Sequence, residues 1–215
     1  MKVARGSKKW ILLSVSTDLI FLILALFSNQ SDLKIILLLF TVALFLKTAA
    51  IIIFFRDPER SIGKGVVAAA DGRIREISKI KDNEVGDCTK ISTFMNLYNV
   101  HVNRVSLGGT IKDVVHKHGI HLPAFKKESE KNERVITTID SDIGAIKIIQ
   151  IAGTLARRID PYIKKGDKLK KGDKIGIIKF GSRVDVYLPI KKIKINVKVG
   201  DMVKAGESTI AEIND

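Results

Sequence analysis

Two long apolar stretches near the N-terminus constrain this 215-residue chain more than any other feature. The first, Trp10–Phe27, is almost entirely apolar and ends at a polar turn, Ser28–Asp32. The second, Ile35–Phe55, contains a single charged residue, Lys47. A helix needs about 20 apolar residues to cross the hydrocarbon core of a bilayer. We therefore expect residues 1–55 to form a hydrophobic helical hairpin that anchors the chain in a membrane.

Two alternatives to a membrane anchor remain open. Charged side chains are costly inside a bilayer, so Asp18 and Lys47 favour a buried hairpin of a soluble domain, unless the two face each other. The first stretch also has the position of a signal peptide, but its core is long and no small-residue cleavage site follows. Basic residues flank both outer ends, which predicts that both ends of the hairpin face the cytoplasm. We expect a cell-membrane protein with residues 56–215 on the cytoplasmic side.

The charge of the chain lies outside the apolar stretches. Lys and Arg outnumber Asp and Glu by 37 to 23, which gives a formal net charge of +14. A basic domain beside a bilayer favours an anionic phospholipid membrane as partner. Aromatic residues make up only 6% of the chain, and no basic helix of RNA-binding type is present, so we expect no nucleic-acid partner. The single cysteine, Cys88, excludes an intrachain disulfide and a Cys-cluster zinc site.

After residue 55 the sequence predicts strands. Short β-branched runs recur between turn signals, as in Ile74–Ile80, Val135–Ile139 and Ile146–Ile151. Over Val184–Leu188, apolar and polar residues alternate, which indicates a half-buried strand. No sustained helical period follows Phe55 and no strand–Gly-rich-loop–helix unit occurs, which argues against a dinucleotide-binding fold.

An internal repeat refines the expected fold. Residues 164–173 and 198–207 share the pattern K-x-G-D-x-(L/V)-K-x-G-(D/E). Gly-Asp turns between short strands are typical of a small β-sandwich, and the pattern resembles the biotinyl/lipoyl barrel-sandwich. A carrier domain would display its lysine in a Met-Lys-Met or Asp-Lys-Ala setting, and neither tripeptide occurs. We predict a mainly β protein, with a barrel-sandwich-like domain over residues 56–215 after the helical hairpin.

The histidines offer one candidate metal cluster. His116, His118 and His121 have a spacing that metal sites use. We interpret them instead as a basic strand end and loop near the surface, and predict no metal site.

The residues that could carry chemistry fall in six short motifs, none of which identifies a function alone. Ala70-Asp71-Gly72 is first of all a hairpin turn, and Gly181-Ser182 is a common dipeptide. The motifs, in chain order, are Phe54–Arg60, Ala70–Gly72, Asn99–Arg104, Leu122–Phe125 followed by Asn132–Arg134, Gly153–Arg158, and Phe180–Pro189.

In this order and spacing, the motifs resemble the phosphatidylserine decarboxylase proenzyme family in its short bacterial and archaeal form. The resemblance covers nearly the whole chain and is most specific at Phe180–Asp185. It implies a carboxy-lyase of phospholipid biosynthesis that converts phosphatidylserine, or the ether lipid archaetidylserine, to the ethanolamine lipid. The alternative is a non-enzymatic, membrane-anchored β-sandwich module of carrier or adaptor type.

The resemblance also implies that the active enzyme is made from a zymogen. Ser182 would attack the carbonyl of Gly181, and the chain would cleave itself into residues 1–181 and 182–215. Ser182 would become a covalent pyruvoyl group, the cofactor that forms a Schiff base with the amine of the substrate. The two products would stay together as a heterodimer, and assembly into a homo-oligomer is open.

Three further residues receive roles from the resemblance. Asp71 and His101 would activate Ser182, and His101 would also protonate the carbanion that remains after loss of CO2. Long-form members carry a second histidine where this chain has Arg104, and we assign Arg104 to binding the substrate's carboxylate or phosphate. Arg56 and Arg60, which follow the second apolar stretch, are either head-group contacts or a topology signal only.

Overall fold

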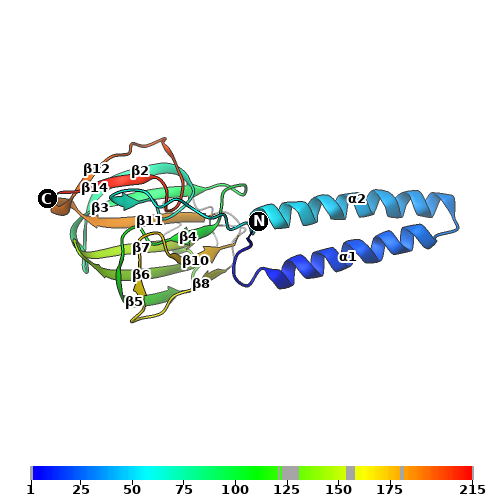
Figure 1. Ribbon diagram of the computed structural model, residues 1–215, viewed down its shortest axis with the longest axis horizontal. Coiled ribbons are helices and arrows are strands. Elements are labelled where there is room, and N and C mark those ends of the chain that lie inside the picture. The colour runs from blue at the N-terminus through cyan, green and yellow to red at the C-terminus, as the bar shows by residue number, and fades with distance from the viewer. Residues whose placement is uncertain (1, 121, 123–130, 154–157, 180–181, 215) are drawn as a thin grey trace. The chain divides into compact units, whose positions relative to one another are not determined.

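The chain comprises two compact units, Met1–Pro58 and Glu59–Asp215. The computed structural model in Figure 1 describes residues 2–120, 122, 131–153, 158–179 and 182–214.

The first unit is a pair of antiparallel helices, α1 (Lys8–Phe27) and α2 (Ser31–Phe54), which lie side by side in Figure 1. The hydroxyls of Ser14 and Thr48 form a hydrogen bond across the pair. Lys47 Nζ lies 4.0 Å from Asp18 Oδ1. The predicted hairpin is therefore confirmed, and its two charged side chains face each other.

Both helices are long and apolar enough to cross a membrane, and most of their residues are not buried. The second helix begins at Ser31, earlier than the sequence predicted, so the turn between the helices is shorter than Ser28–Asp32. Asp32 lies in the first turn of α2, where the partial positive charge of a helix N-terminus favours a carboxylate. This helps to explain why the helix begins four residues before the apolar stretch.

The second unit is built from strands. In chain order within the described residues they are β1 (Val66–Val67), β2 (Gly72–Asp82), β3 (Gly86–Met95), β4 (Val102–Arg104), β5 (Gly109–Lys117), β6 (Arg134–Ser141), β7 (Gly144–Ala152), β8 (Ile159–Pro161), β9 (Lys168–Leu169), β10 (Lys174–Ile178), β11 (Ser182–Pro189), β12 (Ile193–Ile195), β13 (Met202–Val203) and β14 (Thr209–Ile213). One 3-10 turn, Ile190–Lys192, follows β11. The prediction of a mainly β protein that follows a helical hairpin along the chain is confirmed.

The largest sheet has eight strands in the order β13-β2-β3-β11-β7-β6-β5-β9, all antiparallel to their neighbours. It curls around a core, and two three-stranded sheets, β1-β14-β12 and β4-β10-β8, complete the unit (Figure 1). Strand β11 lies at the centre of the large sheet, between β3 and β7, and begins at Ser182.

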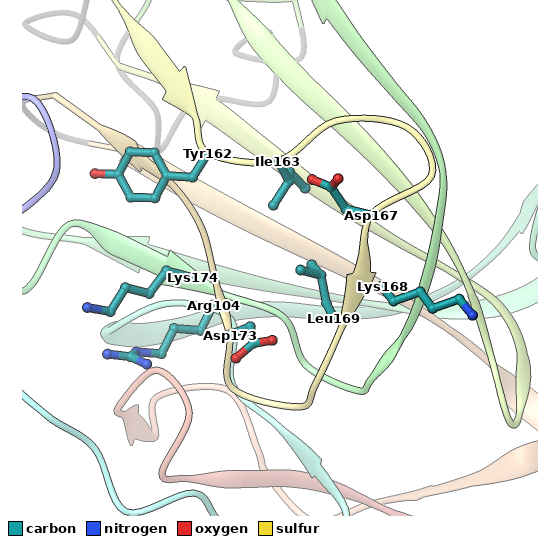
Figure 2. Close-up of a pocket in the computed structure, with 8 residues that line it drawn as sticks. All are labelled: Arg104, Tyr162, Ile163, Asp167, Lys168, Leu169, Asp173 and Lys174. Atoms are coloured by element: carbon teal, nitrogen blue, oxygen red, sulfur yellow. The ribbon is translucent and has the colours of Figure 1, made fainter.

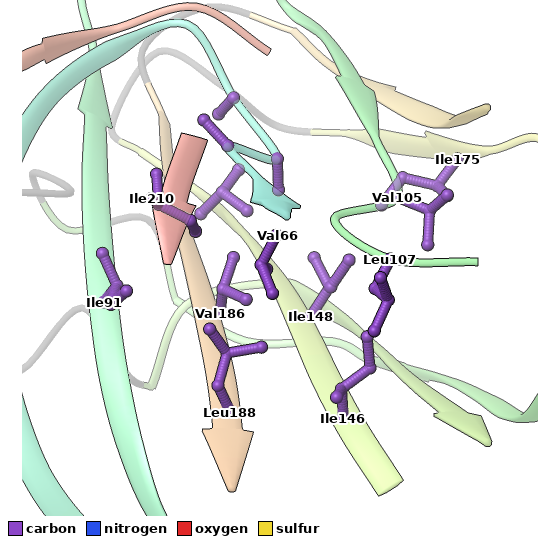
Figure 3. Packing of buried hydrophobic residues seen from close by; sticks show 14 of the residues in the cluster. Val66, Ile91, Val105, Leu107, Ile146, Ile148, Ile175, Val186, Leu188 and Ile210 are labelled. Atoms are coloured by element: carbon purple, nitrogen blue, oxygen red, sulfur yellow. The ribbon is translucent and has the colours of Figure 1, made fainter. Parts of the chain in front are cut away.

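The core lies on the inner face of the curled sheet. Val186 and Leu188 of β11 point into it beside Ile91 of β3 and Ile148 of β7, as Figure 3 shows. The predicted alternation along β11 is correct, but the strand is not half-buried, because Asp185 on its other face is also inaccessible to solvent. On that face Asp185 is paired with Arg183 and lies close to Lys90 of β3, and a pattern within one strand does not reveal such neighbours.

The internal repeat forms two equivalent turns. Gly166 N–H donates to Ile111 O and Ile111 N–H donates to Asp167 O, at 2.9 and 2.8 Å. In the second copy, Gly200 and Asp201 make the same pair of bonds with Ile74, both at 2.9 Å. The strands that follow these turns, β9 and β13, are the two edges of the eight-stranded sheet. The repeat therefore has a structural role, because the strands that follow its two turns form the two edges of the sheet.

Candidate active site

The beginnings of β2 and β11 lie at one end of the large sheet. Phe94, near the end of β3, pairs with Arg73 of β2 on one side and with Arg183 of β11 on the other. Both strands are antiparallel to β3, so both begin where β3 ends. Strands in a sheet are about 4.8 Å apart, so the backbones of β2 and β11 are separated by about 10 Å here. The Ala70–Gly72 turn and Ser182 thus share this end of the sheet.

Ser182 is fully buried at this end. Its hydroxyl donates to the sulfur of Met95, its partner on β3, over 3.2 Å. A thioether is a weak acceptor, so this contact positions Oγ without withdrawing much of its reactivity. Gly181, the other residue of the predicted cleavage site, lies outside the described residues.

The same sulfur accepts a hydrogen bond from one member of a buried pair of side-chain amides. Asn103 Nδ2 donates to Met95 Sδ over 3.6 Å, and Gln150 Nε2 donates to Asn103 Oδ1 over 2.8 Å. The carbonyl oxygen of the Gln150 side chain is buried and accepts no hydrogen bond from the part of the chain that the structure describes. A buried acceptor of this kind is costly unless another group satisfies it. The environment of Ser182 is therefore polar on one side.

The segment before β6 supports the backbone beside Ser182. Ala152 of β7 is the partner of Ser182, and its carbonyl accepts a hydrogen bond from Asn132 Nδ2 over 2.7 Å. Ala152 N–H donates to the carbonyl of Glu133 over 2.9 Å. Two residues of the Asn132–Arg134 motif thus fix the strand end next to Ser182.

Arg60 and the backbone of Ala205 hold the carboxylate of Asp71 by hydrogen bonds. Arg60 Nη2 donates to both carboxylate oxygens, and Ala205 N–H donates to Oδ1 over 2.8 Å. Arg60 also lies 3.4 Å from Glu207 and has only 6% of its side chain exposed. Arg60 therefore belongs to this buried cluster, which argues against the head-group contact that was one of its two sequence-based interpretations.

The glycine after Asp71 is required by the close approach of its turn to β3. Gly72 has a φ of +151°, and a Cβ at this position would lie 2.1 Å from the carbonyl oxygen of Phe94. No flexible side chain can move to make room, since the obstacle is backbone. The turn that carries Asp71 can therefore lie against the end of β3 because position 72 is a glycine.

His101 precedes β4 and is fully buried. Its Nδ1 lies 2.9 Å from the carbonyl oxygen of Asn99. A carbonyl can only accept, so Nδ1 carries the proton and Nε2 keeps its lone pair in the neutral ring. The carbonyl of His101 accepts a hydrogen bond from Ile178 N–H over 3.3 Å. His101 therefore lies against the end of β10, the strand whose continuation leads to Ser182.

The side chain of Arg104 lies on the opposite face of β4 from the side chain of Asn103. Adjacent residues on a strand point to opposite faces, and Arg104 follows Asn103. Its guanidinium donates to Gly172 O over 2.8 Å. It lines a cavity of about 460 Å³ together with Lys174, its partner on β10, and with residues of the first repeat turn, as Figure 2 shows.

The Phe180–Pro189 motif also contains a buried ion pair. Asp185 lies 3.0 Å from Arg183 Nε, two residues away on β11. Burial raises the pKa of Asp185 despite the opposing effects of Arg183 and Lys90. The pair faces away from the core and lies between β3 and β7, so we assign it to holding β11 in place.

Several residues around Ser182 were not predicted from the sequence. Met95, Asn103 and Gln150 were not singled out, although Gln150 interrupts the apolar face formed by Ile146 and Ile148. A polar residue on an apolar strand face was the available signal. His121 lies outside the described residues, as do parts of the motifs at 122–125 and 153–158.

Comparisons with known proteins match nearly the full chain. A family model described as phosphatidylserine decarboxylase matches residues 48–211. A phosphatidylserine decarboxylase proenzyme of Streptomyces avermitilis is 43% identical over 211 residues, which cover 98% of this chain and 93% of the relative. Two archaeal relatives are named "Putative archaetidylserine decarboxylase proenzyme". That of Methanococcoides burtonii is 42% identical (98% and 96% covered), and that of Methanosarcina mazei is 40% identical (99% and 98% covered).

Proposed function

Because this chain belongs to the phosphatidylserine decarboxylase family and is therefore a carboxy-lyase, we propose that it removes CO2 from the serine head group of a phospholipid. The product is the corresponding ethanolamine lipid. Relatives named for phosphatidylserine and for archaetidylserine are about equally similar to the chain, so both lipids are candidate substrates. Family membership sets aside the alternative of a non-enzymatic module.

The proposed maturation begins at Ser182. Oγ adds to the carbonyl carbon of residue 181, and the amide nitrogen of residue 182 leaves, so that the amide becomes an ester. Loss of the α-proton of residue 182 expels the carboxylate of residue 181 and leaves dehydroalanine. Tautomerisation to the imine, addition of water and release of ammonia give a pyruvoyl group at the N-terminus of residues 182–215. Attached covalently at this N-terminus, the pyruvoyl group would supply an electron sink for the decarboxylation.

The observation that carries this proposal is the setting of Ser182. The residue is fully buried at the start of the central strand, and within the described residues its hydroxyl donates to the weak thioether acceptor of Met95. The side-chain oxygen of Gln150, which accepts no hydrogen bond from the residues that the structure describes, adds an acceptor for a polar group formed at residue 182. A buried site of this kind also excludes water from a reactive carbonyl.

We assign the proton transfers to His101 and Asp71. The lone pair on His101 Nε2 can accept the proton of Oγ, and the protonated ring can return a proton to the substrate carbon after CO2 has left. Asp71, fixed by Arg60 and Ala205, assists the activation of Ser182. Arg104 remains the proposed contact for the lipid phosphate, with Lys174 of the same cavity as a second cation.

The helical hairpin is the proposed membrane anchor. Its apolar surface suits a bilayer, and the basic flanks favour the cytoplasmic side for the catalytic domain. The excess positive charge of the chain would concentrate anionic lipid around the enzyme, at about 1 kcal/mol for each Lys or Arg near the surface. The membrane would thus serve as both partner and substrate pool.

Intact-mass spectrometry of the purified protein tests the proposal. We expect two polypeptides, residues 1–181 and residues 182–215, the second starting with a pyruvoyl group in place of an amine. Vesicles that contain phosphatidylserine or archaetidylserine should then lose CO2 in the presence of the protein, and the preferred lipid identifies the natural class of substrate. An uncleaved chain that is active on either lipid would refute the pyruvoyl mechanism.

A further inference from the structure

Three side chains that can bind a metal meet where β5 ends and β6 begins. His116 Nε2 lies 3.0 Å from Glu133 Oε1. The rings of His116 and His118 are stacked, with centroids 4.9 Å apart and an angle of 29° between their planes. One donor atom from each of the three residues lies within 4.8 Å of the others.

In contrast to the expectation from the sequence, which was of no metal site, we propose that His116, His118 and Glu133 bind one divalent transition-metal ion, for which Zn²⁺ is the reference. Two imidazoles and one carboxylate are a set that zinc uses with a fourth position open to water or another ligand. Bonds of about 2.0–2.1 Å place tetrahedral donors roughly 3.3 Å apart. The separation of His116 and Glu133 is already close to this value. His118 is exposed, so its ring can rotate to complete the site.

The carboxylate is positioned before any ion arrives. Glu133 is 8% exposed, its Oε1 also receives Ile159 N–H over 3.4 Å, and its carbonyl binds Ala152 N–H. Hydrogen bonds of this kind orient metal ligands and tune their affinity. The two exposed imidazoles provide the path by which an ion enters. An ion pair between His116 and Glu133 alone would not account for the second imidazole stacked on the first.

The strand register separates this site from Ser182. Ser182 is paired with Ala152, and Ala152 is bonded in turn to Glu133. Two strand spacings, about 10 Å, therefore lie between Ser182 and Glu133 along the end of the sheet. The proposed metal site is a neighbour of the proposed active site and contains none of the residues to which we assign catalysis or substrate binding, so its test does not depend on the decarboxylation.

Calorimetric titration of tag-free, detergent-solubilised full-length protein with Zn²⁺ tests the proposal. We expect one ion per chain, and with Co²⁺ the visible absorption bands of a tetrahedral complex. His116→Ala and His118→Ala should each lower the affinity at least tenfold. Lys117→Ala, which removes the exposed side chain between them, is the matched control and should bind as the wild type does. Glu133→Gln should also weaken binding, and circular dichroism checks that this variant is folded.

Two results would overturn the proposal. One is a wild-type protein that takes up no stoichiometric ion at micromolar protein concentration. The other is stoichiometric binding that both histidine variants retain at full affinity, since the ion would then occupy another part of the chain.

Discussion

Arg60 Nη2 donates a hydrogen bond to each carboxylate oxygen of Asp71, at 3.1 and 2.9 Å. The pair is almost fully buried, and it reaches Ala205 and Glu207 through further polar contacts. If the chain is cleaved before Ser182, Arg60 and Asp71 belong to one product, and Ala205 and Glu207 to the other. The cluster therefore connects the proposed catalytic carboxylate to both products of maturation.

Replacing Arg60 by Met should slow self-cleavage at least tenfold. The variant keeps an apolar side chain of similar length but leaves the buried Asp71 without its cation, and a buried charge without a partner is strongly unfavourable. Arg60→Lys should recover part of the rate because it retains the charge. The measurement is a time course of the appearance of residues 1–181 on denaturing gels. Arg73→Met, an exposed position two residues after Asp71, is the control, and equal rates for both Met variants would exclude a positioning role for Arg60.

Ser182→Ala should abolish both cleavage and decarboxylation, because the variant lacks the nucleophile and the precursor of the cofactor. Ser106→Ala is a suitable control, since Ser106 is another fully buried serine in the same unit. Intact mass and release of CO2 from serine-lipid vesicles are the two readouts. Cleavage of Ser182→Ala at the same bond would show that another residue attacks the carbonyl.

The structural features that depend on residues close together along the chain were predicted correctly from the sequence. Hydropathy identified both helices, and the alternation of Val184, Val186 and Leu188 identified the core face of β11. The repeated Gly-Asp pattern identified two turns, although not that they form the two edges of one sheet.

Contacts across long sequence distances could not be predicted in this way. The hydroxyl of Ser182 touches Met95, 87 residues earlier, and Gln150 bonds to Asn103, 47 residues away. These pairs arise because β11 inserts between β3 and β7, and a strand order is not encoded in any one strand. For the same reason the sequence allowed Arg60 to be interpreted as a head-group contact, whereas in the structure it lies in a buried ion pair with Asp71.

Gly72→Ala should block maturation where Gly86→Ala does not. Both glycines have positive φ angles, so each substitution strains the backbone by roughly 1–3 kcal/mol. Only at Gly72 would the new Cβ also collide with backbone, the carbonyl of Phe94, whereas at Gly86 it meets open space. The collision must displace the turn that carries Asp71. Uncleaved Gly72→Ala chain beside normally cleaved Gly86→Ala chain is the expected result on a denaturing gel, and normal cleavage of both would mean that this turn tolerates displacement.

After cleavage, the two products should remain together until the protein unfolds. Residues 182–215 contain β11, which is hydrogen-bonded to β3 on one side and to β7 on the other. They also contain β12, β13 and β14, and Val203 and Ile210 belong to the common core. We expect co-elution in size-exclusion chromatography in detergent, and separation only in denaturant. Loss of the shorter product under native conditions would contradict the central position of β11.

The stability of the catalytic domain should depend on Lys147 in a pH-dependent way. Lys147 Nζ donates to both oxygens of Asp82 at 2.7 Å and lies 2.9 Å from Glu84. Burial alone would raise the pKa of Asp82, but the hydrogen bonds from Lys147 and from backbone N–H groups outweigh it and lower the pKa. For Lys147, the bonds to the two carboxylates outweigh burial and raise the pKa.

The signs of these shifts define the pH window. A carboxylate with a lowered pKa stabilises the fold above its unfolded value, about 3.9 for Asp, and this contribution is lost as the pH falls through the folded pKa. The raised pKa of Lys147 contributes below its unfolded value of about 10.4, and this contribution is lost as the pH rises through the folded pKa. At neutral pH both contributions are therefore complete.

Lys147→Met should lower the free energy of unfolding by about 1–3 kcal/mol at pH 7, because it leaves Asp82 without its charged donor. In a chain of this size that corresponds to a fall in melting temperature of roughly 2–4 °C for each kcal/mol. In strong acid, below the folded pKa of Asp82, the wild type loses the same interaction, so the difference between the two proteins should narrow. Thermal unfolding of the full-length protein in detergent, followed by circular dichroism at neutral and acid pH, measures both effects. Lys79→Met, at an exposed position of β2, is the control. If the difference in stability between Lys147→Met and the wild type stays constant with pH, the lost stability comes from packing and not from the charge pair.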